Sequence, residues 1–347
     1  MSPGRFHEIE ANYASMSIGV VGDFCLDRYL EIDPARQETS IETGLPVHNV
    51  VNVRSQPGAA GTILNNLVAL GIGEIYAVGF AGEDGEGFEL RKSLQNRHGV
   101  RLDHFWQTDQ RRTFTYCKPL VVEAGKPPLE LNRFDNKNWT PTPALLQGRL
   151  IDSTANVAAD SDALILMDQV ELPETGVITS RLLEAVGCIV RELPYLPIVA
   201  DSRRGLRGYP PVCMKMNGAE LSALADCPGY AELEQLKVVA GALARKQGRS
   251  VFVTLSERGM LGASPEGRIE HVPALPVRGP IDIVGAGDAV TANLTAALAA
   301  GATLRESLEI ATAAASIVIH QLGTTGTATA AQIRTLLEGA ASQGARQ

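Results

Sequence analysis

The sequence has 347 residues, a length that suggests about two folding units or one large α/β domain. Hydrophobic residues make up 45% of it, and 39 Asp and Glu against 31 Lys and Arg give a net charge of −8. A sizeable core is therefore available, while the acidic balance argues against a dedicated nucleic-acid-binding protein, which needs a basic surface. Aromatic residues, at 5%, also argue against stacking platforms for single strands.

The cysteine pattern indicates a reducing compartment, and the apolar pattern shows neither a signal peptide nor a membrane span. Five cysteines at wide spacing, without a C-x-x-C pair, favour core thiols over a disulfide framework or a zinc cluster. The N-terminus has no apolar signal-peptide core, and no uncharged apolar stretch is long enough to span a bilayer. We therefore expect a cytoplasmic protein without a membrane partner. The cysteines are Cys25, Cys117, Cys188, Cys213 and Cys227.

Apolar runs alternate with helical spacing along the chain. The predicted strands are 18–21, 75–80, 164–167, 198–200 and 251–255. The predicted helices are 58–70, 85–97, about 174–191, about 231–247 and most of the tail from 285. This alternation predicts an α/β fold, a doubly wound and mostly parallel sheet with helices on both faces. Two β-rich pieces, about 44–54 and 113–134, do not fit the alternation and are assigned to a small separate sheet.

The segment from Asp282 to Asp288 carries the clearest chemical signal. Gly285 and Gly287 allow the backbone to approach a ligand, and a helix that begins there adds unpaired N–H donors and a partial positive charge. Such a turn binds anions, and Asp288 in the first helical turn can accept a proton from a hydroxyl. Phosphoryl transfer requires both groups. A tight helix start with an Asp near its N-cap is the alternative interpretation.

Competing motifs are missing from the sequence. It contains no G-x-x-x-x-G-K-[ST] and no G-x-S-x-G, and its six histidines form no metal-binding pattern. A dinucleotide fingerprint is also disfavoured, because Gly285-x-Gly287 lacks the third small residue and lies near the C-terminal end.

Seven motifs together resemble the ribokinase-like (PfkB-type) carbohydrate kinases. They occur in the family's order and span about residues 18–325. They are Gly22-Asp23-x-x-x-Asp27, Pro57–Ala60 running on to Asn66 and Gly71, Gly79-x-x-Gly82-x-Asp84-x-x-Gly87, Asn217-x-x-Glu220, Val253–Gly259, Asp282–Asp288 and Gly323-Thr324.

The resemblance implies an enzyme, an ATP-dependent kinase that phosphorylates a hydroxyl of a sugar or sugar phosphate. It implies Asp288 as the base and the N–H groups of Ala286 and Gly287 as the anion hole for the γ-phosphoryl group. Mg²⁺ would be held through water by Asn217 and Glu220, since Mg²⁺ keeps several waters beside phosphates. A monovalent cation is a further candidate cofactor.

The resemblance also implies one kinase domain over residues 1–347, with lid segments at about 28–56 and 110–136. The lid would exclude water, and its edge strands suggest a homodimer formed through the lid. The expected substrate contacts are Asp23, Asp27, Gly58, Ala59, Asn66, Lys118, Arg133 and Arg203. The expected nucleotide contacts are Asn217, Glu220, Thr254, Ser256, Gly259 and Gly323.

Within the family, the sequence is most similar to the heptose-phosphate kinases of ADP-heptose synthesis. The similarity lies in Gly22–Tyr29, in Arg112-Thr113 with Lys118, and in Arg133–Asp135. Asp201-Ser202-Arg203 stands where that subgroup has Asp-Pro-Lys. The chain ends shortly after the kinase motifs, so we expect no fused nucleotidyltransferase domain.

Five departures from the family pattern lie in or near the binding loops and bear on specificity. Two alternatives therefore stay open: a nucleoside kinase of the same fold, weakly disfavoured by the few aromatic residues, and a non-catalytic protein that binds a sugar or nucleotide. The retained Asp288 favours an active kinase. The departures are Val284 for Thr, Ala59 for Gly, Thr62 for Asn, Ser256 for Gly, and 168–170 for Ser-Asp-Tyr.

Overall fold

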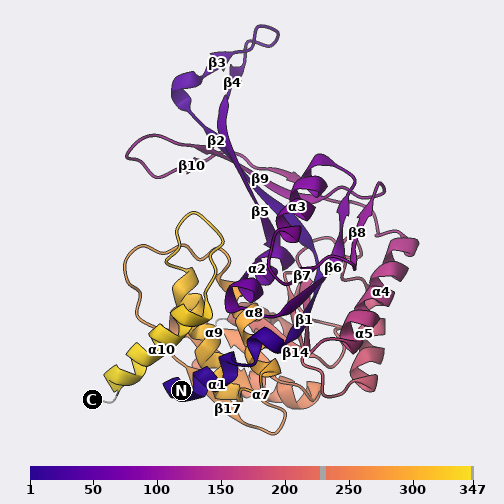
Figure 1. Ribbon diagram of the computed structural model, residues 1–347, viewed down its shortest axis with the longest axis vertical. Coiled ribbons are helices and arrows are strands. Elements are labelled where there is room, and N and C mark those ends of the chain that lie inside the picture. The colour runs from indigo at the N-terminus through magenta and orange to yellow at the C-terminus, as the bar shows by residue number, and fades with distance from the viewer. Residues whose placement is uncertain (227–231, 345–347) are drawn as a thin grey trace.

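The computed structural model describes residues 1–226 and 232–344 (Figure 1). Cys227 and residue 231, the first of the helix expected at 231–247, lie outside the described residues. The other four cysteines are free thiols. Across the described ranges, no helix is both long and apolar enough to cross a membrane.

A ten-stranded sheet forms the centre of the molecule, in the order β17-β16-β15-β14-β13-β12-β1-β6-β7, with β8 paired to β6. Its pairs are parallel from β7 and β8 to β15 and antiparallel from β15 to β17. The apolar runs of β1 and β12 are buried along nearly their whole length, as expected for parallel strands covered on both faces. The strands are β1 Ser17–Gly22, β6 Glu74–Gly82, β7 Val100–Arg101, β8 Phe105–Thr108, β12 Ala163–Asp168, β13 Ile198–Ser202, β14 Cys213–Asn217, β15 Val251–Thr254, β16 Met260–Ala263 and β17 Ile269–Val272.

Helices cover both faces of this sheet, as the sequence predicted. One layer contains α1, α2, α8, α9 and α10, which contact one another, and the other contains α3 to α7. The helices are α1 Pro3–Glu10, α2 Ala60–Leu70, α3 Gly85–Gln95, α4 Ala144–Ala159, α5 Ser180–Glu192, α6 Gly218–Leu224, α7 Leu233–Gln247, α8 Ala286–Ala299, α9 Leu304–Val318 and α10 Ala330–Gly344. Helix α5 begins six residues later than the predicted 174, because the Thr179 side chain caps it by accepting from the Leu182 N–H.

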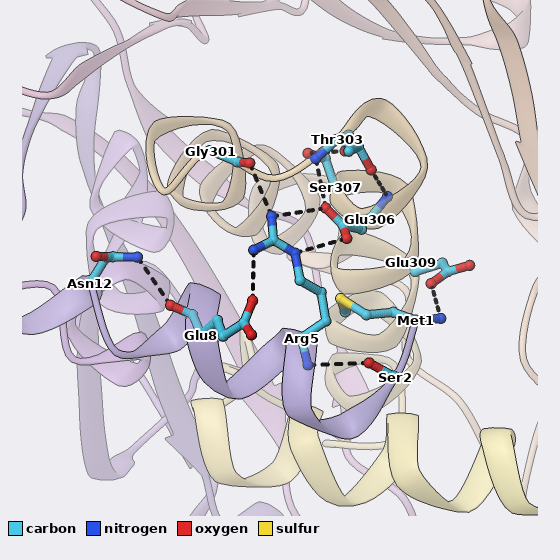
Figure 2. Close-up of polar contacts among 10 residues, drawn as sticks. All are labelled: Met1, Ser2, Arg5, Glu8, Asn12, Gly301, Thr303, Glu306, Ser307 and Glu309. Atoms are coloured by element: carbon cyan, nitrogen blue, oxygen red, sulfur yellow. Dashed lines mark hydrogen bonds and ion pairs between the residues drawn. The ribbon is translucent and has the colours of Figure 1, made fainter.

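The N-terminal helix α1 is tied to α9 by ion pairs (Figure 2). The amino group of Met1 lies 2.5 Å from Glu309 Oε2, and Arg5 Nε donates to Glu306 Oε1 at 3.0 Å. Figure 2 shows the Arg5 guanidinium between Glu306 and Glu8. These contacts join the N-terminal segment of the chain to helix α9, in the same helix layer.

A second, smaller sheet projects from the α/β core, and it confirms the separate sheet expected from the β-rich pieces (Figure 1). Its order is β10-β9-β2-β5, with β11 paired to β9, and β3 and β4 form a short ribbon at its far end. We call the whole projection the lid. Its strands are β2 Phe24–Ile32, β3 Glu38–Thr39, β4 Pro46–Val47, β5 Val50–Ala59, β9 Phe114–Val121, β10 Leu129–Glu130 and β11 Phe134–Asn136.

The polar residues of the predicted site lie where the two sheets meet. Strand β2 begins at Phe24, two residues after β1 ends at Gly22, so the chain passes directly from the core into the lid. The carboxyl ends of β12, β13 and β14 lie at the same edge of the parallel sheet, where α/β folds bind ligands.

Candidate active site

The start of α8 is a turn with unused backbone donors. Gly285 has φ +82°, and a Cβ there would lie 3.2 Å from the Thr325 side chain, so glycine suits the position. The Ala286 N–H donates to the Ile283 carbonyl at 3.2 Å. Within the described residues, the N–H groups of Gly287 and Asp288 have no acceptor. The donors open to an anion are thus those of Gly287 and Asp288, whereas Ala286 is already engaged.

The carboxyl group of Asp288 lies in the first turn of α8 and is partly withdrawn from solvent. Loss of solvent raises its pKa to about 7, and the nearby charges of Asp201 and Asp27 act in the same direction while Lys215 opposes them. A base with a pKa near the operating pH transfers protons efficiently. The position and the pKa of Asp288 are those of a base beside an anion site.

A buried ion pair supports this turn, and the sequence motifs did not identify it. Lys215 Nζ donates to Asp201 Oδ2 at 2.7 Å, and the Thr291 hydroxyl donates to the same oxygen at 2.8 Å. A Cβ on Gly287 would lie 3.2 Å from Lys215 Nζ, so the ammonium group packs against the first turn of α8. The sequence did contain one indication of this pair, the lysine at position 215 inside the otherwise apolar run Cys213–Met216.

Asn217 and Glu220, the residues expected beside Mg²⁺, form a capping box at the start of α6. The Asn217 Oδ1 accepts from the Glu220 N–H at 2.9 Å, and the Glu220 Oε2 accepts from the Asn217 N–H at 2.7 Å. Burial raises the pKa of Glu220 although the Asn217 N–H opposes it. Over the described ranges, no cluster of three His, Cys, Asp or Glu residues could hold a metal directly. Oxygen ligands that act through water, as Mg²⁺ prefers, still fit this arrangement.

The underside of the lid carries a row of polar side chains on adjacent strands. Asp27 is in register with Gln56 on β5 and with Tyr116 on β9, and Tyr116 is in register with Asp135 on β11. In-register neighbours share one face of a sheet. The charge of Asp27 also contributes to the raised pKa of Asp288 at the start of α8. Burial raises the pKa of Asp27, and Lys118 lowers it.

Two predicted cationic contacts lie on this face. Lys118 Nζ lies 3.9 Å from Asp27 Oδ1 and 4.9 Å from the centre of the Tyr29 ring. The Arg133 guanidinium lies 5.3 Å from the centre of the Tyr116 ring and 3.3 Å from Asp135. The structure therefore brings Lys118, Arg133 and Asp27 together on the lid.

Asp23 has a different setting from Asp27. It is fully buried, and its carboxylate accepts three backbone N–H groups, from Val177 at 2.7 Å, Gln169 at 2.9 Å and Val170 at 3.2 Å. Burial, with the neighbouring Asp168, raises its pKa. In this structure Asp23 orders the segment after β12, and its oxygens are engaged with the backbone.

Asp168, one of the departures from the family pattern, forms a buried cluster behind that segment. Its Oδ2 accepts from Arg204 at 2.7 Å, from the Ser202 hydroxyl at 2.8 Å and from the Tyr209 hydroxyl at 3.2 Å. The neighbouring Arg203, an expected phosphate contact, is exposed. Its Nε lies 3.7 Å from Glu171 Oε1. Arg204 is thus engaged with the interior, whereas Arg203 is open to a ligand.

The turn into α2 shows why glycine is needed beside Asp27. A Cβ on Gly58 would lie 2.5 Å from Asp27 Oδ2. Ala59, where the family has glycine, adopts φ +53°, a region in which a side chain is strained. Asn66 is buried and donates to the carbonyls of Thr62 at 3.0 Å and Gly326 at 3.4 Å. Asn66 thus connects helix α2, which follows this turn, to the segment after α9.

The predicted nucleotide residues fall into two groups. Ser256 and Gly259 close a tight turn after β15 in which the Gly259 N–H donates to the Ser256 carbonyl at 3.0 Å, and Thr254 Oγ1 donates to a strand carbonyl. Gly323 lies in the loop between α9 and α10, where its N–H donates to Asp282 Oδ2 at 3.2 Å. The second group thus lies next to the turn that starts α8.

A groove of about 850 Å³ lies between α9, α10 and residues 275–278. Leu275, Ile317 and Leu336 give it apolar walls, and His320 accepts from the Arg278 N–H at 2.9 Å at its edge. The Ser316 hydroxyl is buried there without a partner among the described residues. This hydroxyl is enclosed by protein atoms, so the groove presents chiefly apolar contacts.

Comparison with known proteins defines the class of this protein as a carbohydrate kinase. The sequence profile of the pfkB family of carbohydrate kinases matches residues 24–331, and the chain belongs to this family. The bifunctional protein HldE of Gluconobacter oxydans is 32% identical over 308 residues, which are 88% of this chain and 61% of that protein. HldE of Bradyrhizobium sp. is 30% identical and covers 95% of this chain and 65% of its own. The chain thus spans less than two thirds of these relatives.

Solved structures share the fold at low sequence identity. Arabidopsis thaliana ribokinase, in a complex with ribose and ATP, gives a TM-score of 0.70 at 20% identity and covers 93% of this chain and 99% of its own. Escherichia coli phosphofructokinase-2, in complex with substrates and products, gives 0.68 at 18% identity and covers 92% and 98%. These likenesses confirm the ribokinase-like fold that the sequence motifs predicted.

Proposed function

We propose that this protein transfers the γ-phosphoryl group of ATP to a hydroxyl of a sugar or sugar phosphate, with a heptose phosphate as the favoured substrate. The observation that carries the proposal is the start of α8, where the unused N–H groups of Gly287 and Asp288 lie beside a carboxylate whose pKa is about 7. Donors for phosphate charge and a base for the hydroxyl are the two requirements of phosphoryl transfer.

In the proposed reaction, the Asp288 carboxylate accepts the proton of the substrate hydroxyl. The hydroxyl oxygen forms a bond to the γ-phosphorus as the bond between that phosphorus and the β–γ bridging oxygen breaks, and ADP leaves with the electron pair. The N–H groups at the start of α8 stabilise the charge on the transferring oxygens. The lid covers the site and limits transfer to water.

The cofactor assignment rests on oxygen donors near this turn. Asn217 and Glu220 would hold Mg²⁺ through water, and the bound ion would neutralise part of the phosphate charge. A monovalent cation remains a candidate cofactor, since E. coli phosphofructokinase-2 has been solved in complex with potassium. Turnover in potassium compared with turnover in tetramethylammonium tests this part.

The nucleotide base is assigned to the groove between α9 and α10. Its apolar walls suit a purine ring. Ser316→Leu is expected to weaken ATP binding about tenfold by filling the groove, with little effect on the sugar KM. Calorimetric titration with ATP measures the change.

The sugar is assigned to the space between the lid and α8. Asp27 would orient its hydroxyls, and Lys118 and Arg133, whose carboxylate partners lie at 3.9 and 3.3 Å, would contact a phosphate or a hydroxyl-rich end. The heptose preference is drawn from the HldE relatives, which match this chain at about 30% identity.

We also propose a homodimer formed through the lid. Exposed apolar side chains follow its edge strand β5, where Val50, Val51 and Val53 are each more than two-fifths exposed. Edge strands with apolar side chains favour pairing with a second chain. Light scattering of the protein, compared with a Val51→Lys/Val53→Lys variant, tests the dimer.

A cytoplasmic location completes the proposal. The four described cysteines are free thiols, which is typical of a reducing compartment, and the proposed reaction consumes ATP. Separation of the cells that make this protein into cytoplasmic, membrane and secreted fractions, with detection of the protein in each, tests this location.

ADP release with Mg-ATP, measured over heptose and hexose phosphates, free sugars and nucleosides, tests the central proposal. Turnover is expected with one sugar class. Asp288→Asn, which removes the base and keeps the shape, is expected to lower kcat by about a thousandfold. Measurable ATP binding without turnover on any acceptor would instead favour a non-catalytic member of the family, and turnover on nucleosides alone would favour a nucleoside kinase.

A further inference from the structure

Lys215 is a buried ammonium group with unused hydrogen-bonding capacity. It lies on β14 and is 7% exposed, and Nζ donates to Asp201 Oδ2 at 2.7 Å. No second acceptor contacts this nitrogen among the described residues. An ammonium group has three donors, and buried donors are normally all paired. Lys215 therefore has donors that can contact a ligand while its bond to Asp201 is kept.

The unused donors lie at the anion turn. A Cβ on Gly287 would come within 3.2 Å of Lys215 Nζ, so the ammonium group contacts the first turn of α8 at the residue whose own N–H is unpaired. The N–H of Asp288 is unpaired there as well. Donors from the backbone of α8 and from a side chain of β14 thus gather at one place.

Asp201 holds the ammonium group in that position. Its Oδ2 accepts from both Lys215 and the Thr291 hydroxyl, and that hydroxyl also donates to the Gly287 carbonyl at 3.1 Å. The network joins β13, β14 and α8 below the turn. A lysine fixed in this way loses little freedom when it binds a ligand.

The lysine keeps its charge despite burial. Burial alone would lower the pKa of Lys215, but the charge and hydrogen bond of Asp201, together with Asp288 and Glu220, raise it. The positive charge of Lys215 lies near the carboxylates of Asp201, Asp288 and Glu220. It therefore offsets part of the repulsion between these carboxylates and a phosphate.

We propose that Lys215 is a further catalytic residue, which donates from its ammonium group to the transferring phosphoryl group, and that Asp201 is its positioning residue. This inference rests on the proposed function. A charge fixed where negative charge develops on the phosphoryl oxygens stabilises the transition state more than the free substrate does.

The test uses variants that separate a phosphate contact from a structural ion pair. Lys215→Met removes the cation but leaves Asp201 buried and unpaired, which is costly for folding. Lys215→Met/Asp201→Asn removes both charges and provides a variant expected to fold. Lys215→Arg keeps a cation at the position, and Lys237→Met, at an i,i+3 pair with Glu234 on α7, is the matched control.

Calorimetry with Mg-ADP and with a non-hydrolysable ATP analogue gives the first readout. The double variant is expected to bind ADP within about twofold of the wild type and the analogue at least tenfold more weakly, because only the analogue carries the terminal phosphoryl group. Its kcat is expected to fall about a hundredfold, with partial recovery in Lys215→Arg. Lys237→Met is expected to match the wild type.

The outcomes separate this inference from the proposed function. A double variant with wild-type kcat and an unchanged ratio of analogue to ADP affinity would overturn the role of Lys215 while leaving the kinase intact. A wild-type protein that binds nucleotide but phosphorylates no acceptor would overturn the proposed function. The ratio of affinities would then still report whether Lys215 contacts the terminal phosphoryl group.

Discussion

The carboxyl edge of the central sheet and the underside of the lid hold their charged side chains in different ways. At the sheet edge, Lys215 and Asp201 are joined at 2.7 Å, and Arg204 and Asp168 are joined at 2.7 Å with the Asp168 side chain 1% exposed. Each pair has a further partner. The Thr291 hydroxyl donates to Asp201, and the Ser202 hydroxyl donates to Asp168. These charges cannot change partners without breaking a buried network.

The lid pairs are looser. Lys118 lies 3.9 Å from Asp27, and Arg133 lies 3.3 Å from Asp135 with its side chain 41% exposed. Both cations also lie over tyrosine rings, a contact that supports a cation without neutralising it. Such side chains can exchange their carboxylate for a ligand at low cost.

The comparison indicates a division of labour between the two regions. A network that is buried and held by short ion pairs suits a reaction in which charge must be stabilised at one fixed point. Cations that are paired only weakly, such as Lys118 and Arg133, suit contacts that differ between substrates. The base and the glycine turn are retained in this chain. Its departures from the family pattern fall in both regions, since Ala59 and Thr62 lie at the turn into α2 and Asp168 belongs to the sheet-edge network.

The largest expected effect concerns the buried pair of Arg204 and Asp168. Arg204→Met leaves the Asp168 carboxylate buried without its cation, and we expect the free energy of unfolding to fall by about 3 kcal/mol. Urea unfolding measures the loss. Arg204→Met/Asp168→Asn removes both charges and is expected to recover most of it. A loss below about 0.5 kcal/mol in the single variant would put this pair in the same class as the exposed lid pairs.

The next largest effect is the pH dependence set by Asp288. Because the base must be deprotonated and its pKa is about 7, kcat/KM is expected to fall about tenfold for each pH unit below 7. Rates between pH 5 and pH 9 measure this limb. An acid limb centred near the ordinary carboxyl value of 3.8 would show that burial and the charges around α8 do not raise the pKa of the base.

Stability should change with pH in the opposite direction. The folded protein favours protonated Asp288, whose unfolded pKa is near 3.8. Its contribution to stability is therefore fully present below about pH 4 and is lost as the pH rises through 7. The difference in unfolding free energy between the wild type and Asp288→Asn isolates this contribution, and a difference that does not vary with pH would contradict it.

Local patterns explain what the sequence could predict. The apolar run 18–21 lies within β1, and the glycine turn at 285–287 starts α8, because burial of short runs and helix initiation depend on neighbouring residues. Helix α4, Ala144–Ala159, was not predicted, and neither was β14. In β14 a lysine interrupts the apolar run, and only the Asp201 carboxylate on the adjacent strand makes its burial tolerable.

Contacts between distant residues account for the rest. The burial of Asp23 depends on N–H groups about 150 positions away, after β12. The pairing of Lys215 with Asp201 depends on the register of β13 and β14, in which Ala200 faces Met214. Motif matching predicted ligand contacts through resemblance, but it had no access to residues such as Lys215, whose setting depends on a neighbouring strand.

The fourth prediction concerns Lys118 on the lid. Lys118→Met is expected to raise KM about fivefold for a phosphorylated sugar and to leave kcat within about twofold, because an exchangeable cation contributes binding rather than transition-state stabilisation. Lys126→Met, at the exposed turn beyond β9, is the control. A fall in kcat without a change in KM would place Lys118 with the catalytic network and remove the contrast between the two regions.

The smallest expected effect tests the lid as an exchangeable surface. Arg54 pairs with Glu31 at 2.7 Å, but the two side chains are 43% and 23% exposed. Arg54→Ala is expected to lower the free energy of unfolding by no more than about 0.5 kcal/mol, and half a molar of salt should abolish even that difference. The 2.7 Å distance matches that of the Arg204 pair, so burial is the main difference between them. Equal losses in the two arginine variants would show that distance, rather than burial, determines how firmly this protein holds its charges.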